Sequence, residues 1–253
     1  MTQDQTSTSS ARNPMLDQLI KNGIECLDKA ENTSEDWLYV LYIADARKEF
    51  RSAVEIAPDE PWLWFQIGWL ELIDSDEIDD PEPIRAALQR ALDLDLDLVA
   101  AHVALAYVEA KISKARYFDS EEYWEYFDHY LEESDKVDLL EQRVAENDDP
   151  EIVGAFRIQI EQLRADMKRA TEGLRQRMEQ AIWTGPAGEH LRAARGRNWH
   201  ELFEARDVTI PGTVVVIEYY PCVIGNLRLI DMLDELGEYL PTSERASFYD
   251  SIG

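Results

Sequence analysis

The chain has 253 residues, of which 45% are hydrophobic, enough to bury a large core as one extended domain or two smaller ones. Its 52 acidic and 25 basic residues give a formal net charge of −27, which disfavours nucleic-acid phosphates and anionic lipid as direct partners. No apolar run approaches the roughly 18 residues of a membrane span. We therefore expect a protein partner, of basic character, with no membrane and no directly bound nucleic acid.

The first 14 residues are polar and lack the apolar core of a signal peptide, which predicts a disordered tail. Cys26 and Cys222 lie far apart and form no Cys-x-x-Cys pattern. Two ordinary thiols in a reducing cytoplasm are the expected reading.

Helical periodicity dominates the chain from residue 15 onward, so the predicted fold class is mainly α. Helices are expected over 15–31, 36–57, about 61–74, 84–95, 98–113, 120–147 and 150–183, and after Asn226 and Pro241. An acidic, proline-containing loop is expected over 74–83.

Apolar residues recur at alternating threes and fours between Pro150 and Trp183, the spacing of a coiled-coil seam. They are Phe156, Ile160, Leu163, Met167, Ala170, Leu174, Met178 and Ala181. We favour an antiparallel hairpin with residues 120–147. The alternative is a homodimer that pairs through residues 150–183.

The C-terminal part changes character at "DVTIPGTVVVIEYYP", whose β-branched and aromatic residues flank a Pro211-Gly212 turn. This pattern predicts a β-hairpin, which must pack on helices because two strands alone are not stable. The expected organisation is a tail (1–14), helical repeats (15–118), a long helical hairpin (119–183) and a small α+β element (184–253).

Two stretches share one layout, a helix, a short acidic turn and a second helix, and lie 38 residues apart. They are "ARKEFRSAVEIAPDEPWLWFQIGWLEL" and "IRAALQRALDLDLDLVAAHVALAYVEA". Over about residues 15–113 the chain resembles a tetratricopeptide repeat (TPR) protein. The residues that carry the resemblance are Ala46, Phe50, Ala53 and Pro58 in one helix, then Trp64, Ile67 and Gly68 in the next. The later pairs depart from the family pattern at Glu71, Ile84 and Leu96.

The stretch "EPWLWFQIGWLELID" (60–74) is apolar almost all round, as buried helices are. The resemblance implies that Trp62, Phe65 and Trp69 line a concave groove, to which Val103 and Tyr107 of the next unit contribute. Aromatic anchors in such a groove suit a partner peptide or helix. The alternative is that the chain's own C-terminal helices fill the groove.

A basic segment lies between Arg157 and Arg206, with ten basic and seven acidic residues, whereas residues 1–150 carry 36 acidic and 13 basic residues. Arg192, Arg195 and Arg197 lie beside Trp199, a combination that can bind nucleic acid. Given the global charge, we prefer a contact with the acidic N-terminal half or with a partner protein.

Motifs for chemistry are weak throughout. "DLDLDL" (93–98) lacks the glycine and the glutamate of a calcium loop, and the acidic 74–80 loop is more typical of a solvated surface than of a cation site. The histidines, at 102, 129, 190 and 200, form no metal-binding motif, and no nucleophile or phosphate-binding motif is present. We expect no enzyme activity, no metal and no cofactor.

The function expected from these patterns is that of an adaptor or chaperone-like protein that binds a partner segment in the aromatic groove. The alternative is an acidic inhibitor that imitates nucleic acid and occupies a DNA- or RNA-binding protein. Seven lysines against 18 arginines, with many aspartates, also suit adaptation to high salt.

Overall fold

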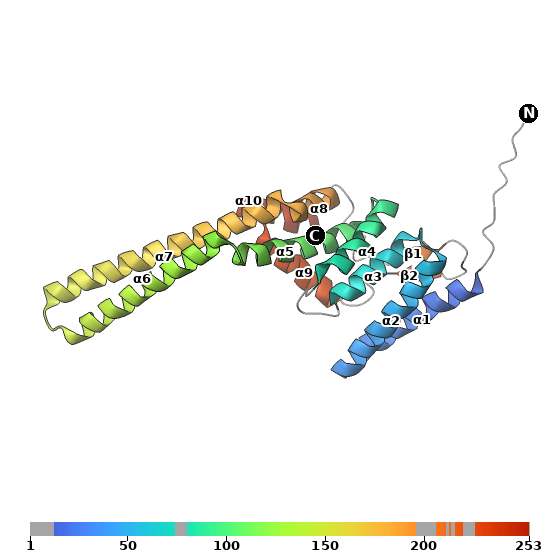
Figure 1. The fold of residues 1–253 in the computed structure, drawn as a ribbon, viewed down its shortest axis with the longest axis horizontal. Coiled ribbons are helices and arrows are strands. Elements are labelled where there is room, and N and C mark those ends of the chain that lie inside the picture. The colour runs from blue at the N-terminus through green and yellow to red at the C-terminus, as the bar shows by residue number, and fades with distance from the viewer. Residues whose placement is uncertain are drawn as a thin grey trace, which may run out of the picture.

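The computed structural model describes residues 13–73, 80–195, 206–210, 213, 216–219 and 226–252, and these are mainly helical (Figure 1). The helices are α1 (Pro14–Glu31), α2 (Asp36–Ile56), α3 (Pro61–Ile73), α4 (Pro81–Leu94), α5 (Val99–Phe118), α6 (Glu121–Glu146), α7 (Pro150–Thr184), α8 (Pro186–Arg195), α9 (Asn226–Tyr239) and α10 (Thr242–Ile252). The strands are β1 (Arg206–Thr209) and β2 (Val216–Tyr219).

Short polar side chains start several of these helices. The Asn13 side chain accepts hydrogen bonds from the backbone N–H groups of Met15 and Leu16, at 3.1 and 3.3 Å. Asp80 accepts from the backbone N–H of Glu82 at 3.2 Å, and Pro81 occupies the first turn of α4. The expected loop therefore ends earlier than predicted, because proline is tolerated in a first turn, where its missing N–H has no helical partner.

The first five helices pack in sequence, α1 on α2, α2 on α3, α3 on α4 and α4 on α5. The chain then leaves this body through α6, returns through α7, and places α8 on α5. The body thus contains helices from both ends of the sequence.

Two glycines permit close helix packing in the body. A Cβ added at Gly68 of α3 would lie 2.7 Å from Cγ of Leu88 in α4. A Cβ at Gly23 of α1 would lie 2.6 Å from the Phe50 ring in α2. Both neighbouring side chains are fully buried, so these helix pairs require glycine at their crossing points.

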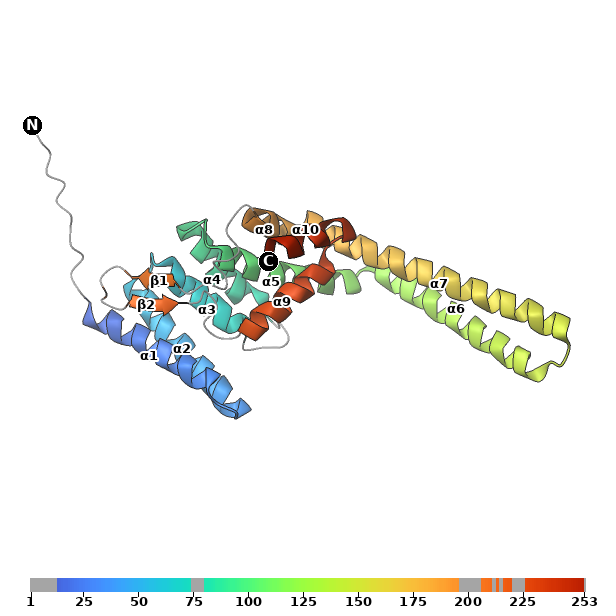
Figure 2. The same ribbon diagram turned by 180° about the vertical axis from the view of Figure 1, so that it is seen from behind.

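Helices α6 and α7 form an antiparallel hairpin that projects from the body as an arm (Figures 1 and 2). Val137, Ile160 and Leu174 are buried in its seam. The seam of α7 therefore packs on α6 of the same chain, which is the arrangement we favoured over pairing with a second chain.

The C-terminal segment returns to the body. Strands β1 and β2 pair antiparallel, from Arg206 opposite Tyr219 to Thr209 opposite Val216, and the predicted turn at 211–212 lies outside the described residues. Ile210, the α9 residues Met232, Leu233, Leu236 and Tyr239, and Phe248 of α10 belong to the same hydrophobic core as α1 to α5. The described part of the segment 184–253 therefore shares its core with the N-terminal helices.

None of the described helices is long and apolar enough to cross a membrane.

The glycine contact in α3 is testable. Gly68→Ala should lower the free energy of unfolding by about 1–3 kcal/mol, because the new methyl group overlaps Leu88, which is fully buried and cannot move aside. Gly154→Ala in α7, where nothing lies within 4 Å of the added Cβ, is the control and should raise stability by up to about 1 kcal/mol. Urea unfolding of both variants measures the difference. Equal effects would contradict the packing argument.

Candidate protein-interaction site

The aromatic stripe of α3 lies in the interior of the body. Trp62, Phe65 and Trp69 are 3%, 0% and 1% exposed. The rings of Phe50 and Trp62 meet edge to face at 5.4 Å, and those of Phe65 and Trp69 stack at 6.2 Å. These three side chains therefore present no surface to a partner in this conformation.

Trp64, on the same helix, lies at the edge of the core. It is only partly buried, and its indole Nε1–H donates to the carbonyl oxygen of Pro58 at 2.8 Å. The resemblance placed Trp64 in the core and Trp62, Phe65 and Trp69 at the groove. The structure reverses these roles, because Trp62, Phe65 and Trp69 belong to the hydrophobic core and Trp64 packs against its edge.

The two α5 residues of the predicted groove face the same C-terminal half. Val103 is fully buried. The hydroxyl of Tyr107 donates to the carboxylate of Glu235 in α9 at 2.7 Å, and Lys111 forms an ion pair with the same carboxylate. Nζ of Lys114 donates to the hydroxyl of Tyr239 at 3.0 Å. Helix α9 thus occupies the groove side of α5, as the alternative reading expected.

We expected basic residues of the C-terminal half to meet acidic residues of the N-terminal half, but the charges in this contact are the other way round. The lysines come from the acidic N-terminal half, and the carboxylate comes from the C-terminal half. Arg192 instead stacks on the Trp183 ring at 4.9 Å, and Arg195 pairs with Glu244 of α10 at 3.3 Å. Neither described contact reaches the N-terminal helices, and Arg197 lies outside the described residues.

The polar contacts between α5 and α9 shift the pKa values of Glu235 and Tyr239. Burial by itself would raise the pKa of Glu235, but the hydrogen bonds from Lys111, Tyr239 and Tyr107 outweigh it and hold the pKa below its ordinary value. Burial and the bond to this carboxylate raise the pKa of Tyr239. The cluster is therefore a charged clamp between α5 and α9.

A second polar cluster joins α4, α5 and α8. Nδ1 of His102 and Nδ1 of His190 lie 3.3 Å apart, and Nε2 of His102 donates to the Leu96 carbonyl oxygen at 3.1 Å. Burial lowers the pKa of His190. Nearby, Nε of Arg85 donates to the buried carboxylate of Glu109 at 2.6 Å. The Arg85–Glu109 contact links α4 to α5, and the His102–His190 contact links α5 to α8.

No group of three or more potential metal-ligating side chains occurs in the part of the chain that the structure describes. The acidic loop weighed as a loose cation site lies at 74–79, outside the described residues, apart from Asp80, which caps α4.

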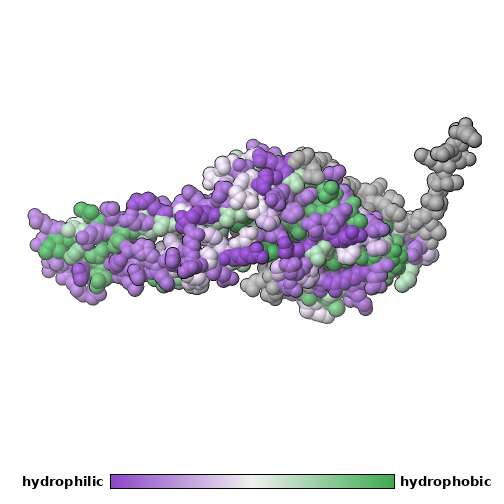
Figure 3. All heavy atoms as spheres, turned by 45° about the horizontal axis from the view of Figure 1, so that its top comes forward, coloured by the Kyte–Doolittle hydropathy of each residue, from purple (hydrophilic) through white to green (hydrophobic). Residues whose placement is uncertain are grey.

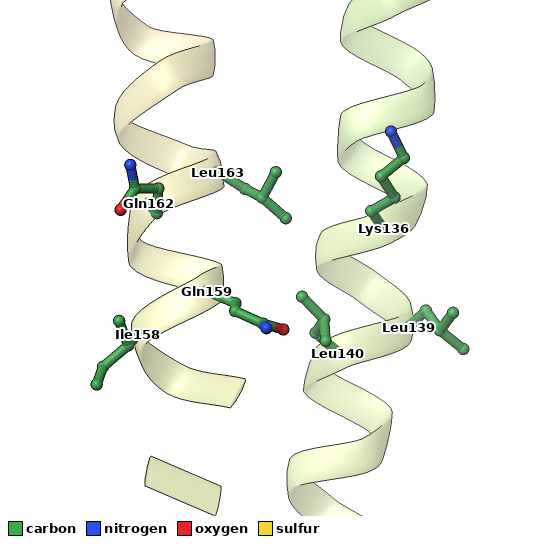
Figure 4. Close-up of a pocket in the computed structure, with 7 residues that line it drawn as sticks. All are labelled: Lys136, Leu139, Leu140, Ile158, Gln159, Gln162 and Leu163. Atoms are coloured by element: carbon green, nitrogen blue, oxygen red, sulfur yellow. The ribbon is translucent and has the colours of Figure 1, made fainter. Parts of the chain in front are cut away.

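The arm presents several exposed apolar side chains. Leu131, Leu139 and Ile158 are 47%, 50% and 67% exposed, and hydrophobic residues gather at the free end of the arm in Figure 3. A groove of about 550 Å³ lies between α6 and α7 here (Figure 4). Leu140, Leu163 and Gln159 point into the space between the helices, while Leu139 and Ile158 point outward on either side (Figure 4).

Two further hollows lie closer to the body. One, of about 320 Å³, is lined by Tyr126, His129, Tyr130, Glu133, Asp166, Met167 and Ala170. Another, of about 430 Å³ at the base of the arm, is lined mainly by aromatic residues, namely Tyr117, Phe118, Tyr123, Tyr126, Phe127 and Tyr130, with Thr171, Leu174, Arg175 and Met178.

The sequence carried a signal for this surface. Leu139 and Ile158 fall outside the spacing of threes and fours that defines the seam, so a two-helix hairpin cannot bury them. The arm is therefore the candidate interaction site that sequence reasoning missed.

Comparison of the chain with protein-family models, with curated proteins and with solved structures finds no match.

The burial of the α3 stripe predicts the effect of truncating it. Trp69→Ala should lower the free energy of unfolding by about 3–5 kcal/mol, because it removes a fully buried indole. Trp37→Ala is the matched control, since Trp37 on α2 is 65% exposed, and it should change stability by less than about 0.5 kcal/mol. Thermal or urea unfolding distinguishes the two, and a Trp69→Ala protein as stable as the control would contradict the burial.

The clamp on α9 predicts a pH dependence. Because the pKa of Glu235 is lower in the folded chain, its stabilisation is complete above the ordinary glutamate pKa and is lost as the pH falls through the folded-state pKa. Glu235→Gln should therefore lower the free energy of unfolding by about 1–3 kcal/mol at neutral pH, with the difference shrinking below about pH 4.5. Glu238→Gln, exposed on the same helix, is the control and should behave as wild type. A constant difference at all pH values would show that the charge of Glu235 is not what matters.

Proposed function

We propose that the chain is a protein-binding adaptor without catalytic activity, in which the body is a scaffold and the α6–α7 arm holds the partner. The observation that supports this is the exposure of large apolar side chains along an arm that projects from the body. Clustered apolar residues on a surface mark interaction sites more often than isolated ones do.

The TPR-like reading of the body is part of the proposal. It is supported by the packing of α1 on α2 and of α3 on α4, and by the tight contacts at Gly23 and Gly68. Helix α8 packs on α5 as the second helix of a third pair would, with the arm inserted between the two. In this view the arm is an insertion within a repeat.

The arm replaces the concave groove as the proposed contact surface. Trp62, Phe65, Trp69 and Val103 contribute to the stability of the body, and Tyr107 is engaged by α9. A partner that used the groove would have to displace α9 and its clamp. The arm needs no such rearrangement.

A reducing, cytoplasmic setting remains our proposal for this protein. Cys26 is a free thiol, and burial together with Asp45 raises its pKa. A raised pKa keeps the thiol protonated, and a protonated thiol reacts slowly.

The acidic inhibitor remains the second candidate, and the exposed carboxylates along α6 favour it. That helix carries ten acidic and two basic residues, a net charge of −8. A mimic of nucleic acid would bind through these charges alone, so its affinity would fall steeply with salt and would not depend on the apolar residues.

Site-specific photo-crosslinking tests the adaptor proposal. A photoreactive residue replaces Ile158 at the arm in one protein and Leu96 of the body, equally exposed at 67%, in the control. We expect discrete protein adducts from position 158 and about tenfold fewer from position 96, because anchoring contacts concentrate at a few interface residues. Equal labelling from the two positions, or none from position 158, would overturn the proposal. Adducts that disappear at high salt and persist in a Leu139→Ser background would support the acidic inhibitor instead.

A further inference from the structure

We propose that the arm binds a basic amphipathic helix of its partner, along a groove between α6 and α7 that runs from Tyr126 and Ala170 to Leu140 and Ile158. The inference rests on the proposed adaptor function and names the chemistry of the partner. It is carried by the continuity of the groove and by the unbalanced charge of its two sides.

The groove is continuous along one face of the arm. Its two hollows follow one another, and their lining residues recur every three or four positions on both helices. On α6 these are Tyr126, His129, Tyr130, Glu133, Lys136 and Leu140; on α7 they are Gln159, Gln162, Leu163, Asp166 and Ala170. Residues with this spacing share one face of a helix, so the two hollows form one elongated site.

The shape of this site suits a third helix. A stretch of about 15 helical residues spans about 22 Å, which is the length over which α6 lines the groove. Leu140 and Leu163 supply an apolar floor, and Leu139 and Ile158 flank it as partly exposed walls. An amphipathic helix laid in such a groove would bury its apolar face against these four side chains.

Charge decides the character of that helix. On α6, Glu122, Glu133 and Glu141 are neutralised by Arg177, Lys136 and Arg164. Other exposed carboxylates of α6 have no ion-pair partner among the described residues, and two of them, Glu125 and Glu132, lie on the side of α6 next to the groove. The α6 side of the groove therefore carries two uncompensated carboxylates, which favour lysines and arginines on the polar face of the bound helix.

A second copy of the chain fits less well. Helix α7 has six basic and five acidic residues, and within the described structure only Arg157 and Lys168 of its basic residues lack an ion-pair partner. A second arm would therefore bring more uncompensated carboxylates than cations to the interface. Like charges in contact disfavour that pairing.

Binding of a synthetic peptide tests the inference. The probe is a fluorescent peptide of about 18 residues, made of leucine and lysine with the leucines on one helical face. Two peptides serve as controls, one with glutamate in place of lysine and one with the leucine and lysine order scrambled. Fluorescence anisotropy with the full chain at near-physiological salt should show binding of the first peptide about tenfold or more tighter than either control.

Paired protein variants locate the site. Leu139→Ser with Ile158→Ser should weaken binding of the Leu/Lys peptide about tenfold, while Leu96→Ser on the body should leave it unchanged. A variant with Glu125→Gln and Glu132→Gln should weaken binding at low salt and reduce its salt dependence. All these side chains are exposed, so circular dichroism should show native helix content in each variant.

Several results would overturn the inference. Equal binding of the scrambled peptide, or undiminished binding by the double serine variant, would show that the net charge of the whole chain attracts the peptide. Sedimentation that shows a wild-type dimer and a monomeric double serine variant would assign the groove to a second copy. If the peptide fails while crosslinking from position 158 still captures a protein, the partner chemistry is wrong and the adaptor function stands. If both fail, the adaptor function fails as well.

Discussion

The structure depends on the burial of α3. Ten of its 13 residues are buried, and they lie on every side of the helix, so no single neighbour can cover them. Helices α2 and α4 pack on it, and the C-terminal half contributes Met232, Leu233 and Leu236 to the same core. Removing this much apolar surface from water is the main favourable term in folding, and it requires the two ends of the sequence to meet.

The return of the C-terminal half explains why the aromatic stripe is not a binding groove. An open helical-repeat surface would leave Trp62, Phe65 and Trp69 in contact with water. The stripe instead lies inside a core that α2, α4 and α5 share with residues of the C-terminal half, and α9 is held on α5 by a clamp in which α5 supplies lysines and α9 supplies Glu235. In a molecule of net charge −27, placing the few lysines at an internal contact lowers repulsion where the halves meet.

The arm is the counterpart of this closed body. A two-helix hairpin has one seam, so apolar residues outside the seam stay at the surface, as Leu139 and Ile158 do. The same hairpin separates charge, because α6 is strongly acidic and α7 is nearly balanced. The arm therefore combines an apolar groove between α6 and α7 with an acidic helix, α6, and for this reason the proposals about function concern the arm.

The sequence by itself determined the helices and most of their ends. Helical periodicity, prolines and the polar residues before each first turn act locally, so positions such as the break at 147–150 were predictable. It also determined that the stretch 60–74 is buried somewhere, since a helix apolar on all sides has no face for water. Tertiary structure alone decided which side of α3 meets which neighbour, and it assigned Trp64 to the margin and Trp69 to the core. The reason is that α9, which joins the same core, lies more than 150 residues from α3 in the chain, and no local pattern encodes a shared core over that separation.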